Sequence, residues 1–119
     1  MESKINIEVR SEDIGEGIKL IRIDGALDTV TSPKADELIS PLLDDSGLFI
    51  FDCTNLNYMN STGLALMLKF HIHLQNREKQ FKVVIMNKFL REIMDVSGAL
   101  KILDVYRTKE EAIESFKKP

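Results

Sequence analysis

Four consecutive apolar residues, Leu48 to Phe51, lie between a turn-forming segment at 44–47 and a polar segment that begins at Asp52. A strand with one solvated face alternates apolar and polar residues, whereas a strand covered on both faces carries an unbroken apolar run. The run therefore predicts a central strand in a sheet with helices packed on it. We expect an α/β fold.

The residues before this run predict a hairpin followed by a helix. Apolar and polar residues alternate from Ile5 to Val9, a polar turn with glycine occupies 11–17, and apolar positions resume over 18–23. Two such segments joined by a turn are typical of a β-hairpin. Ser32 is then expected to cap a helix over 33–43, because Pro33 suits the first helical position.

The residues after the run alternate between helix and strand patterns. The expected elements are a helix over Thr62 to Arg77, a strand over Phe81 to Met86, a helix over Phe89 to Val96 ended by Gly98, a strand over Ile102 to Tyr106 and a helix from Thr108 through Phe116. The order β-β-α-β-α-β-α-β-α requires crossover helices, so the sheet should be mixed and mostly parallel after the first hairpin. We expect residues 1–119 to form one domain.

The charge balance limits the partners. Sixteen Lys and Arg residues against 19 Asp and Glu residues give a net charge of -3, which disfavours nucleic acid and anionic membranes. The start has no apolar signal segment and no apolar stretch approaches the roughly 18 residues of a membrane span, so a cytoplasmic location is expected. The sequence leaves the oligomeric state open. Cys53, the only cysteine, should be a buried apolar residue.

A small hydroxyl residue, Ser61, lies where the strand pattern has ended and the helix pattern begins. Asn60, Ser61 and Thr62 are all residue types that cap helices, and spacing alone favours capping as the role of Ser61. Gly63 is harder to explain, since glycine in the first turn weakens a helix by roughly 0.5–1 kcal/mol. It does leave backbone amides open, as in an anion site that accommodates a phosphorylated serine.

Helical periodicity divides the helix from Thr62 into two sides. Lys69, His73 and Arg77 form a polar stripe, and the opposite side is apolar and should face the sheet. Leu66 falls on the polar stripe by its spacing of three to Lys69. We expect it to be exposed, either as an isolated apolar residue or as a contact for a partner beside Ser61.

The segment from Asp52 to Leu64 resembles the signature of the STAS domain in bacterial anti-sigma-factor antagonists. In that signature a strand ending in Asp leads to an aromatic or apolar residue, Met or Ile, Asp or Asn, Ser, Ser or Thr, and Gly. The upstream segment 25–28, Gly-Ala-Leu-Asp, resembles a second family motif, and 108–113 resembles the terminal segment. The element order also agrees, so the similarity covers nearly the whole chain.

This resemblance implies a switch controlled by phosphorylation of Ser61. The partner would be an anti-sigma factor that is also a serine kinase, with a histidine-kinase-like ATPase fold, and a serine phosphatase would reverse the modification. The unphosphorylated form would bind the partner and free the sigma factor. Asp28, Asn60, Thr62, Gly63 and Leu66 would flank Ser61 as partner contacts. Many family members have Asp where this chain has Asn60.

Two other functions remain as alternatives. One is a STAS scaffold or adaptor that uses the same surface without being phosphorylated. The other is a serine-dependent enzyme, which we disfavour because there is no Gly-x-Ser-x-Gly motif and both histidines follow Ser61 on its own helix. His71 and His73 point to different sides of that helix, which argues against a shared metal. We expect no catalytic residue, metal or cofactor.

Overall fold

A computed structural model describes residues 6–117 of the chain. Their helices and strands, in chain order, are β1 (Ile7–Asp13), β2 (Ile18–Leu27), α1 (Ser32–Ile39), the 3-10 helix η1 (Ser40–Asp44), β3 (Leu48–Asp52), β4 (Leu56–Met59), α2 (Ser61–Gln75), β5 (Gln80–Val84), α3 (Lys88–Val96), the 3-10 helix η2 (Ala99–Lys101), β6 (Asp104–Tyr106) and α4 (Lys109–Lys117).

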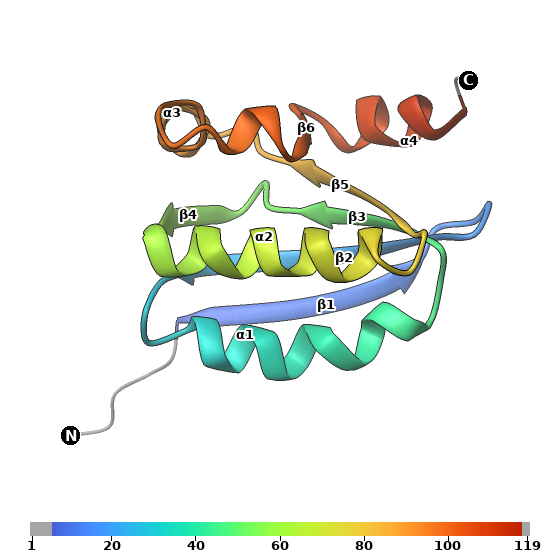
Figure 1. Ribbon diagram of the computed structural model, residues 1–119, viewed down its shortest axis with the longest axis horizontal. Coiled ribbons are helices and arrows are strands. Elements are labelled where there is room, and N and C mark those ends of the chain that lie inside the picture. Colours follow the sequence, from blue (N-terminus) through green and yellow to red (C-terminus); the bar gives the residue numbers. More distant parts are fainter. Residues whose placement is uncertain (1–5, 118–119) are drawn as a thin grey trace.

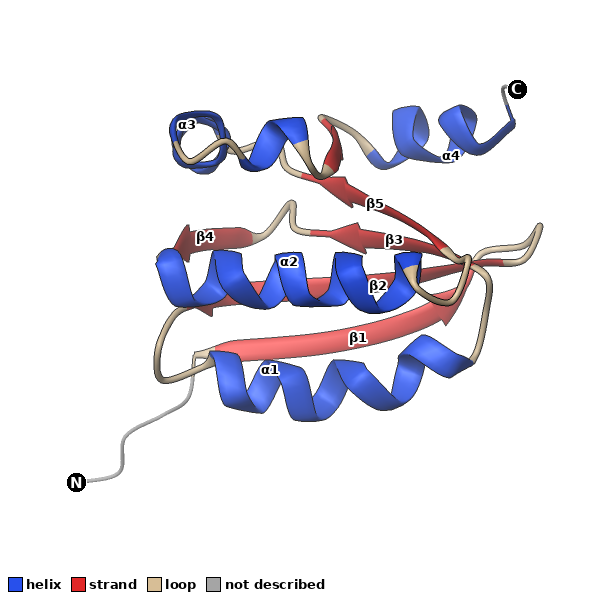
Figure 2. Cartoon of the chain, in the orientation of Figure 1, coloured by secondary structure: helices blue, strands red, loops and turns tan. Residues whose placement is uncertain are grey.

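One mixed sheet runs through the molecule, and helices pack on both of its faces (Figures 1 and 2). The hydrogen-bonded order is β1-β2-β3-β5-β6, with β4 paired to the last part of β2. Only the β1–β2 pair is antiparallel. The predicted hairpin and mostly parallel mixed sheet are therefore confirmed. The parallel strands bring their carboxyl ends to one edge of the sheet, the carboxyl edge.

Two apolar clusters of unequal size lie on the two faces. The larger contains buried residues from α1, α2 and α3 together with Phe49 and Phe51 of β3. The smaller lies beneath α4 and contains Ile50 of the same strand. Phe49, Ile50 and Phe51 are all fully buried, as expected for a central strand covered on both faces.

Lys82 of β5 contacts α4 beside the smaller cluster. Its ammonium group donates to the carboxylate of Asp104 at 2.6 Å and lies 4.8 Å from the ring centre of Phe116 in α4. Burial alone lowers the pKa of Lys82, but hydrogen bonds with Asp104 and Tyr106 outweigh it and raise the pKa. The lysine therefore stays charged in an apolar setting.

The predicted element order omits one strand. β4 is only four residues long, and it pairs in parallel with β2 from Gly25 to Leu27 across a register shift. The other differences are smaller: the predicted helix over 33–43 is α1 followed by η1, and the last strand begins at Asp104 because η2 occupies 99–101. Ile5, the expected start of the first strand, lies outside the described residues.

The cap expected at Ser32 is wrong. Thr31 is the N-cap residue of α1 and makes no side-chain capping bond, while Ser32 is the first helical residue and its hydroxyl oxygen is buried without a hydrogen-bond partner. By contrast, Thr108 makes a side-chain capping bond at the start of α4, because its hydroxyl accepts a hydrogen bond from the Glu111 backbone amide at 3.1 Å. Gly98 also follows α3 with a left-handed φ of 83°, as expected for a helix-ending glycine.

The prediction that Leu66 is exposed is also wrong, since only 7% of the residue is accessible. The polar stripe of α2 lies beside α1, where the Lys69 ammonium group is 2.7 Å from Asp36. The hydrogen bond from Lys69 lowers the pKa of Asp36. Because α1 covers this side of α2, Leu66 is part of the larger cluster. The large apolar side chain that α2 exposes is instead that of Ile72, which is 55% accessible.

Cys53 is fully buried, as expected, and burial raises the pKa of its thiol. Within residues 6–117, no helix has both the length and the apolar content needed to cross a membrane.

Candidate functional site: the first turn of α2 at the carboxyl edge

The loop after β2 and the first turn of α2 meet at the carboxyl edge. The Asn60 amide donates to the Leu27 carbonyl at 3.2 Å, which continues the pairing of β4 with β2 beyond the strands. Two residues further along each segment, the hydroxyl groups of Thr29 and Thr62 are 3.2 Å apart and hydrogen-bonded. Asp28 directly follows Leu27, and Ser61 directly follows Asn60. Asp28 and Ser61 therefore both lie at the carboxyl edge, as expected.

Asp28 builds the loop that it occupies. Its Oδ1 accepts hydrogen bonds from the backbone amides of Val30 and Thr31, each at 2.9 Å. In return, the Thr31 hydroxyl accepts a hydrogen bond from the Asp28 amide at 2.8 Å. The bond from the Thr31 amide is the main reason why the pKa of Asp28 lies below its ordinary value of 3.8. The carboxylate therefore orders the loop that is joined to the first turn of α2 by the bond between Thr29 and Thr62.

Asn60, not Ser61, caps α2. Its side-chain oxygen accepts the amides of Thr62 at 3.0 Å and Gly63 at 3.2 Å from an extended backbone conformation. The interpretation of Ser61 as the cap is therefore wrong, and Ser61 is the first helical residue with an exposed side chain. The prediction of an open anion site is also wrong for these two amides, because both already donate hydrogen bonds to the Asn60 side chain.

Gly63 is where α2 approaches the end of β2 most closely. A Cβ atom at this position would lie 2.3 Å from the Leu27 carbonyl oxygen and 2.9 Å from the Leu27 side chain. Glycine is therefore required by packing, and not to keep amides open. Because Gly63 and Leu66 are both buried, the partner contacts expected of them do not fit the structure.

Exposed apolar side chains lie on the segments that follow β2 and β5 at the same edge, in loops and in the first turn of α3. Val30, in the loop after β2, is 68% accessible, and Met86 and Phe89, after β5, are each 56% accessible. Sequence patterns did not identify these residues or Thr29. Val30 and Thr29 fall between the predicted second strand and the predicted first helix, and Met86 and Phe89 fall inside predicted elements, so only the expectation that carboxyl ends of parallel strands carry binding residues pointed to this region.

The two histidines lie at the far end of α2 from Ser61. His71 and His73 follow Ser61 by ten and twelve residues, which corresponds to about 15 Å or more along a helix axis. The His71 ring is tilted against the ring of Phe81 at a centroid distance of 6.3 Å, and the His73 ring is 3.1 Å from the Arg77 guanidinium group. Neither histidine is therefore placed to activate the Ser61 hydroxyl as a general base.

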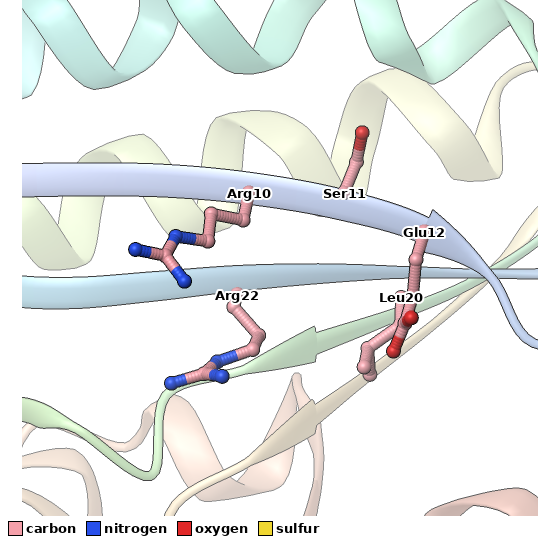
Figure 3. A pocket seen from close by; sticks show the side chains of 5 residues that line it. All are labelled: Arg10, Ser11, Glu12, Leu20 and Arg22. Atoms are coloured by element: carbon pink, nitrogen blue, oxygen red, sulfur yellow. The ribbon is translucent and has the colours of Figure 1, made fainter.

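A hollow of about 230 Å³ lies on the face of β1 and β2 that α1 and α2 do not cover. Figure 3 shows Arg10, Glu12, Leu20 and Arg22 on this side, while Ser11 points the other way. Both arginines are paired with carboxylates of their own strands, Arg10 with Glu8 and Arg22 with Asp24. We interpret this face as ordinary solvated surface. Residues 6–117 also contain no group of three or more potential metal ligands.

The fold and site together define a class: a small α/β domain that presents a serine hydroxyl at the start of a helix on its carboxyl edge. The model of the STAS domain family matches residues 9–112. The chain belongs to the STAS domain family.

Curated relatives carry a consistent name. The chain is 26% identical over 102 residues to an anti-sigma-B factor antagonist of Staphylococcus aureus (strain NCTC 8325 / PS 47), a match that covers 85% of this chain and 92% of the relative.

Solved structures with the same fold share less sequence. An anti-sigma factor antagonist from Mycobacterium paratuberculosis superposes with a TM-score of 0.88 at 22% identity, covering 99% of this chain and all of the other. Bacillus SpoIIAA in its phosphorylated form gives a TM-score of 0.67 at 22% identity, covering 92% of this chain and 99% of the other. These two likenesses establish the fold.

The contact of Gly63 with Leu27 leads to a first prediction. Gly63→Ala should lower the free energy of unfolding by about 1–3 kcal/mol, the usual cost of inserting a methyl group into packed surroundings. Gly47→Ala is the matched control, because a Cβ there meets nothing within 4 Å. Urea denaturation measures both. Equal stability of the two variants would show that α2 can move away from Leu27 without cost.

The cap of α2 leads to a second prediction. Asn60→Ala should lower the free energy of unfolding by about 1 kcal/mol, because it removes the acceptor for two first-turn amides. Asn60→Asp should keep or slightly raise stability at neutral pH, since a carboxylate caps equally well and suits the helix dipole. Thermal and urea unfolding of the pair test this. A loss in Asn60→Asp as large as that in Asn60→Ala would contradict the capping role.

The lowered pKa of Asp28 leads to a third prediction. Its stabilising effect should be complete above the ordinary carboxyl pKa of 3.8 and should be lost as pH falls through the lower folded-state pKa. Asp28→Asn should therefore be less stable than the wild type at neutral pH, and the difference should shrink below pH 3.8. Urea titrations at several pH values measure this. A difference independent of pH would exclude the charge as its cause.

Proposed function

We propose that this chain is an anti-sigma-factor antagonist that works by partner switching. In its unphosphorylated form it binds an anti-sigma factor that is also a serine kinase, with a histidine-kinase-like ATPase fold, and the sigma factor is released. Phosphorylation of Ser61 blocks this binding, and a serine phosphatase restores it. The protein acts in the cytoplasm as a binding regulator and not as an enzyme.

The observation that carries this proposal is the state of the Ser61 hydroxyl. It is exposed on a rigid first turn, at an edge that also presents the apolar side chains of Val30, Met86 and Phe89. Apolar surface beside a neutral hydroxyl suits a protein partner. A kinase also needs an accessible acceptor, and Ser61 provides one because Asn60 performs the capping.

The same geometry suggests why phosphorylation would prevent binding. A phosphoserine adds roughly -1.5 to -2 charges. The nearest first-turn amides, those of Thr62 and Gly63, are already bonded to Asn60. The new charge would therefore not be met by these two amides, and it would add to an exposed edge that already carries the carboxylate of Asp28. A partner that fits the neutral form would have to desolvate this charge, which is costly.

The relatives support this proposal by name. The Staphylococcus aureus relative is called an anti-sigma-B factor antagonist, and SpoIIAA has been solved in a phosphorylated form. Many family members have Asp at the position of Asn60. The side-chain oxygen of Asn60 caps α2, as a carboxylate oxygen could, so the geometry of the first turn is compatible with the proposal. Asp28, Asn60 and Thr62 remain the proposed flanking contacts, and Thr29 joins them through its bond to Thr62.

The fourth prediction tests phosphorylation and binding separately. Incubation with ATP and the anti-sigma factor, followed by mass mapping, should find the phosphate on Ser61 and on no other residue. In calorimetry, wild type and Ser61→Ala should bind the anti-sigma factor with similar affinity, and Ser61→Asp should bind at least about tenfold more weakly, since an unpaired buried charge costs more than 1.4 kcal/mol.

Ser11→Asp is the matched control, because it adds the same charge at an exposed serine on β1. It should bind like the wild type. Equal affinities of Ser61→Asp and Ser11→Asp, with no phosphate on Ser61, would favour an unphosphorylated scaffold or adaptor. Failure of the wild type to bind any anti-sigma factor would overturn the antagonist role itself.

A further inference from the structure

A groove of about 670 Å³ lies between α3 and the carboxyl ends of β5 and β6. Its volume falls in the range of sites for small molecules, about 300–1,000 Å³. Its lining combines two apolar side chains with charged groups of both signs: Met86, Lys88, Arg91, Glu92, Asp95, Leu100 and Arg107. Of these residues, only Met86 also belongs to the exposed apolar side chains of the Ser61 edge.

Backbone pairing brings together the segments that carry two arginines of the lining. The Ile85 amide, directly after β5, donates to the Tyr106 carbonyl at the end of β6 at 2.8 Å. The Arg91 guanidinium group reaches back from α3 to within 3.4 Å of the Ile85 carbonyl oxygen. Arg107 is the residue directly after Tyr106. Arg91 and Arg107 therefore come from neighbouring segments, and both line the groove.

These two arginines have no carboxylate partner within the described part of the chain. None of the ion pairs of residues 6–117 includes Arg91 or Arg107, whereas Arg10 and Arg22 on the uncovered sheet face are both paired. A guanidinium group has five donors in a planar fork that matches a carboxylate or phosphate. Two such groups in one groove suit an anion.

The two acidic residues of the lining further restrict the chemistry of the ligand. Glu92 and Asp95 of α3 also line the groove and would repel the rest of a ligand that was anionic throughout. They would accept hydrogen bonds from hydroxyl or ammonium groups. A matching ligand is therefore small, with one anionic group for the arginines and several hydrogen-bond donors for the carboxylates.

We propose that the groove between α3 and β6 binds a small organic anion that carries hydroxyl or ammonium donors, with Arg91 and Arg107 holding its phosphate or carboxylate group. Glu92 and Asp95 bind the donors, and Met86 and Leu100 contact the body of the molecule. The site does not depend on Ser61 or on its phosphorylation, so it stands or falls separately from the antagonist role.

The fifth prediction concerns this site and uses three probes with the same sugar body. Glucose 6-phosphate carries a phosphate, glucuronate carries a carboxylate, and glucose carries no charge. In a two-dimensional amide NMR titration of the whole chain, at least one charged probe should give saturable shifts at residues 85–95 and 107, and glucose should give none. The charged probe that saturates at lower concentration identifies which anion the arginines prefer.

Arg107→Gln and Arg91→Gln should each weaken the binding of that probe by about tenfold, because each removes one charged hydrogen-bond donor. Arg77→Gln is the control, since Arg77 lies at the end of α2 beside His73, and it should bind the probe like the wild type. The absence of saturable shifts with both charged probes would overturn the proposal, as would equal binding by Arg107→Gln, Arg91→Gln and Arg77→Gln.

Discussion

The close approach of α2 to the end of β2 is the constraint on which the rest of the site depends. Gly63 lets the first turn of the helix rest against the Leu27 carbonyl group, with no room for a Cβ atom. The same carbonyl accepts the Asn60 amide, so one backbone group fixes both the helix and its cap residue. The position of Ser61 follows directly, because it lies between Asn60 and Gly63.

Asn60 separates two roles that sequence patterns alone could not separate. Three neighbouring residues, at 60–62, are all of types that cap helices, but only the first has the extended backbone conformation that directs its side chain to the first-turn amides. Ser61 therefore does not cap the helix, which would let its side chain be modified without loss of the cap. A phosphorylated cap would alter its own helix, whereas a phosphate on Ser61 would leave the cap in place.

The sequence predicted those features of the fold that depend on local patterns. The unbroken run at 48–51 identified the central strand, and alternation identified the hairpin. It did not predict β4, because four residues that are half polar have no clear period and are held by pairing with β2. Leu66 was misplaced for a related reason: periodicity gives its direction on α2, but only the packing of α1 determines that this side is covered.

The site shows the same division between local and tertiary information. Ser61, Asp28 and Asn60 stand out in the sequence because their residue types and positions after strands are informative. Thr29 does not, since its relevance arises from its hydrogen bond to Thr62, 33 residues away. That bond joins the loop built by Asp28 to the helix that carries Ser61. A partner that bound here would therefore meet two chain segments as one surface, and a charge added to Ser61 would lie within that surface, above the packing of Gly63 against Leu27.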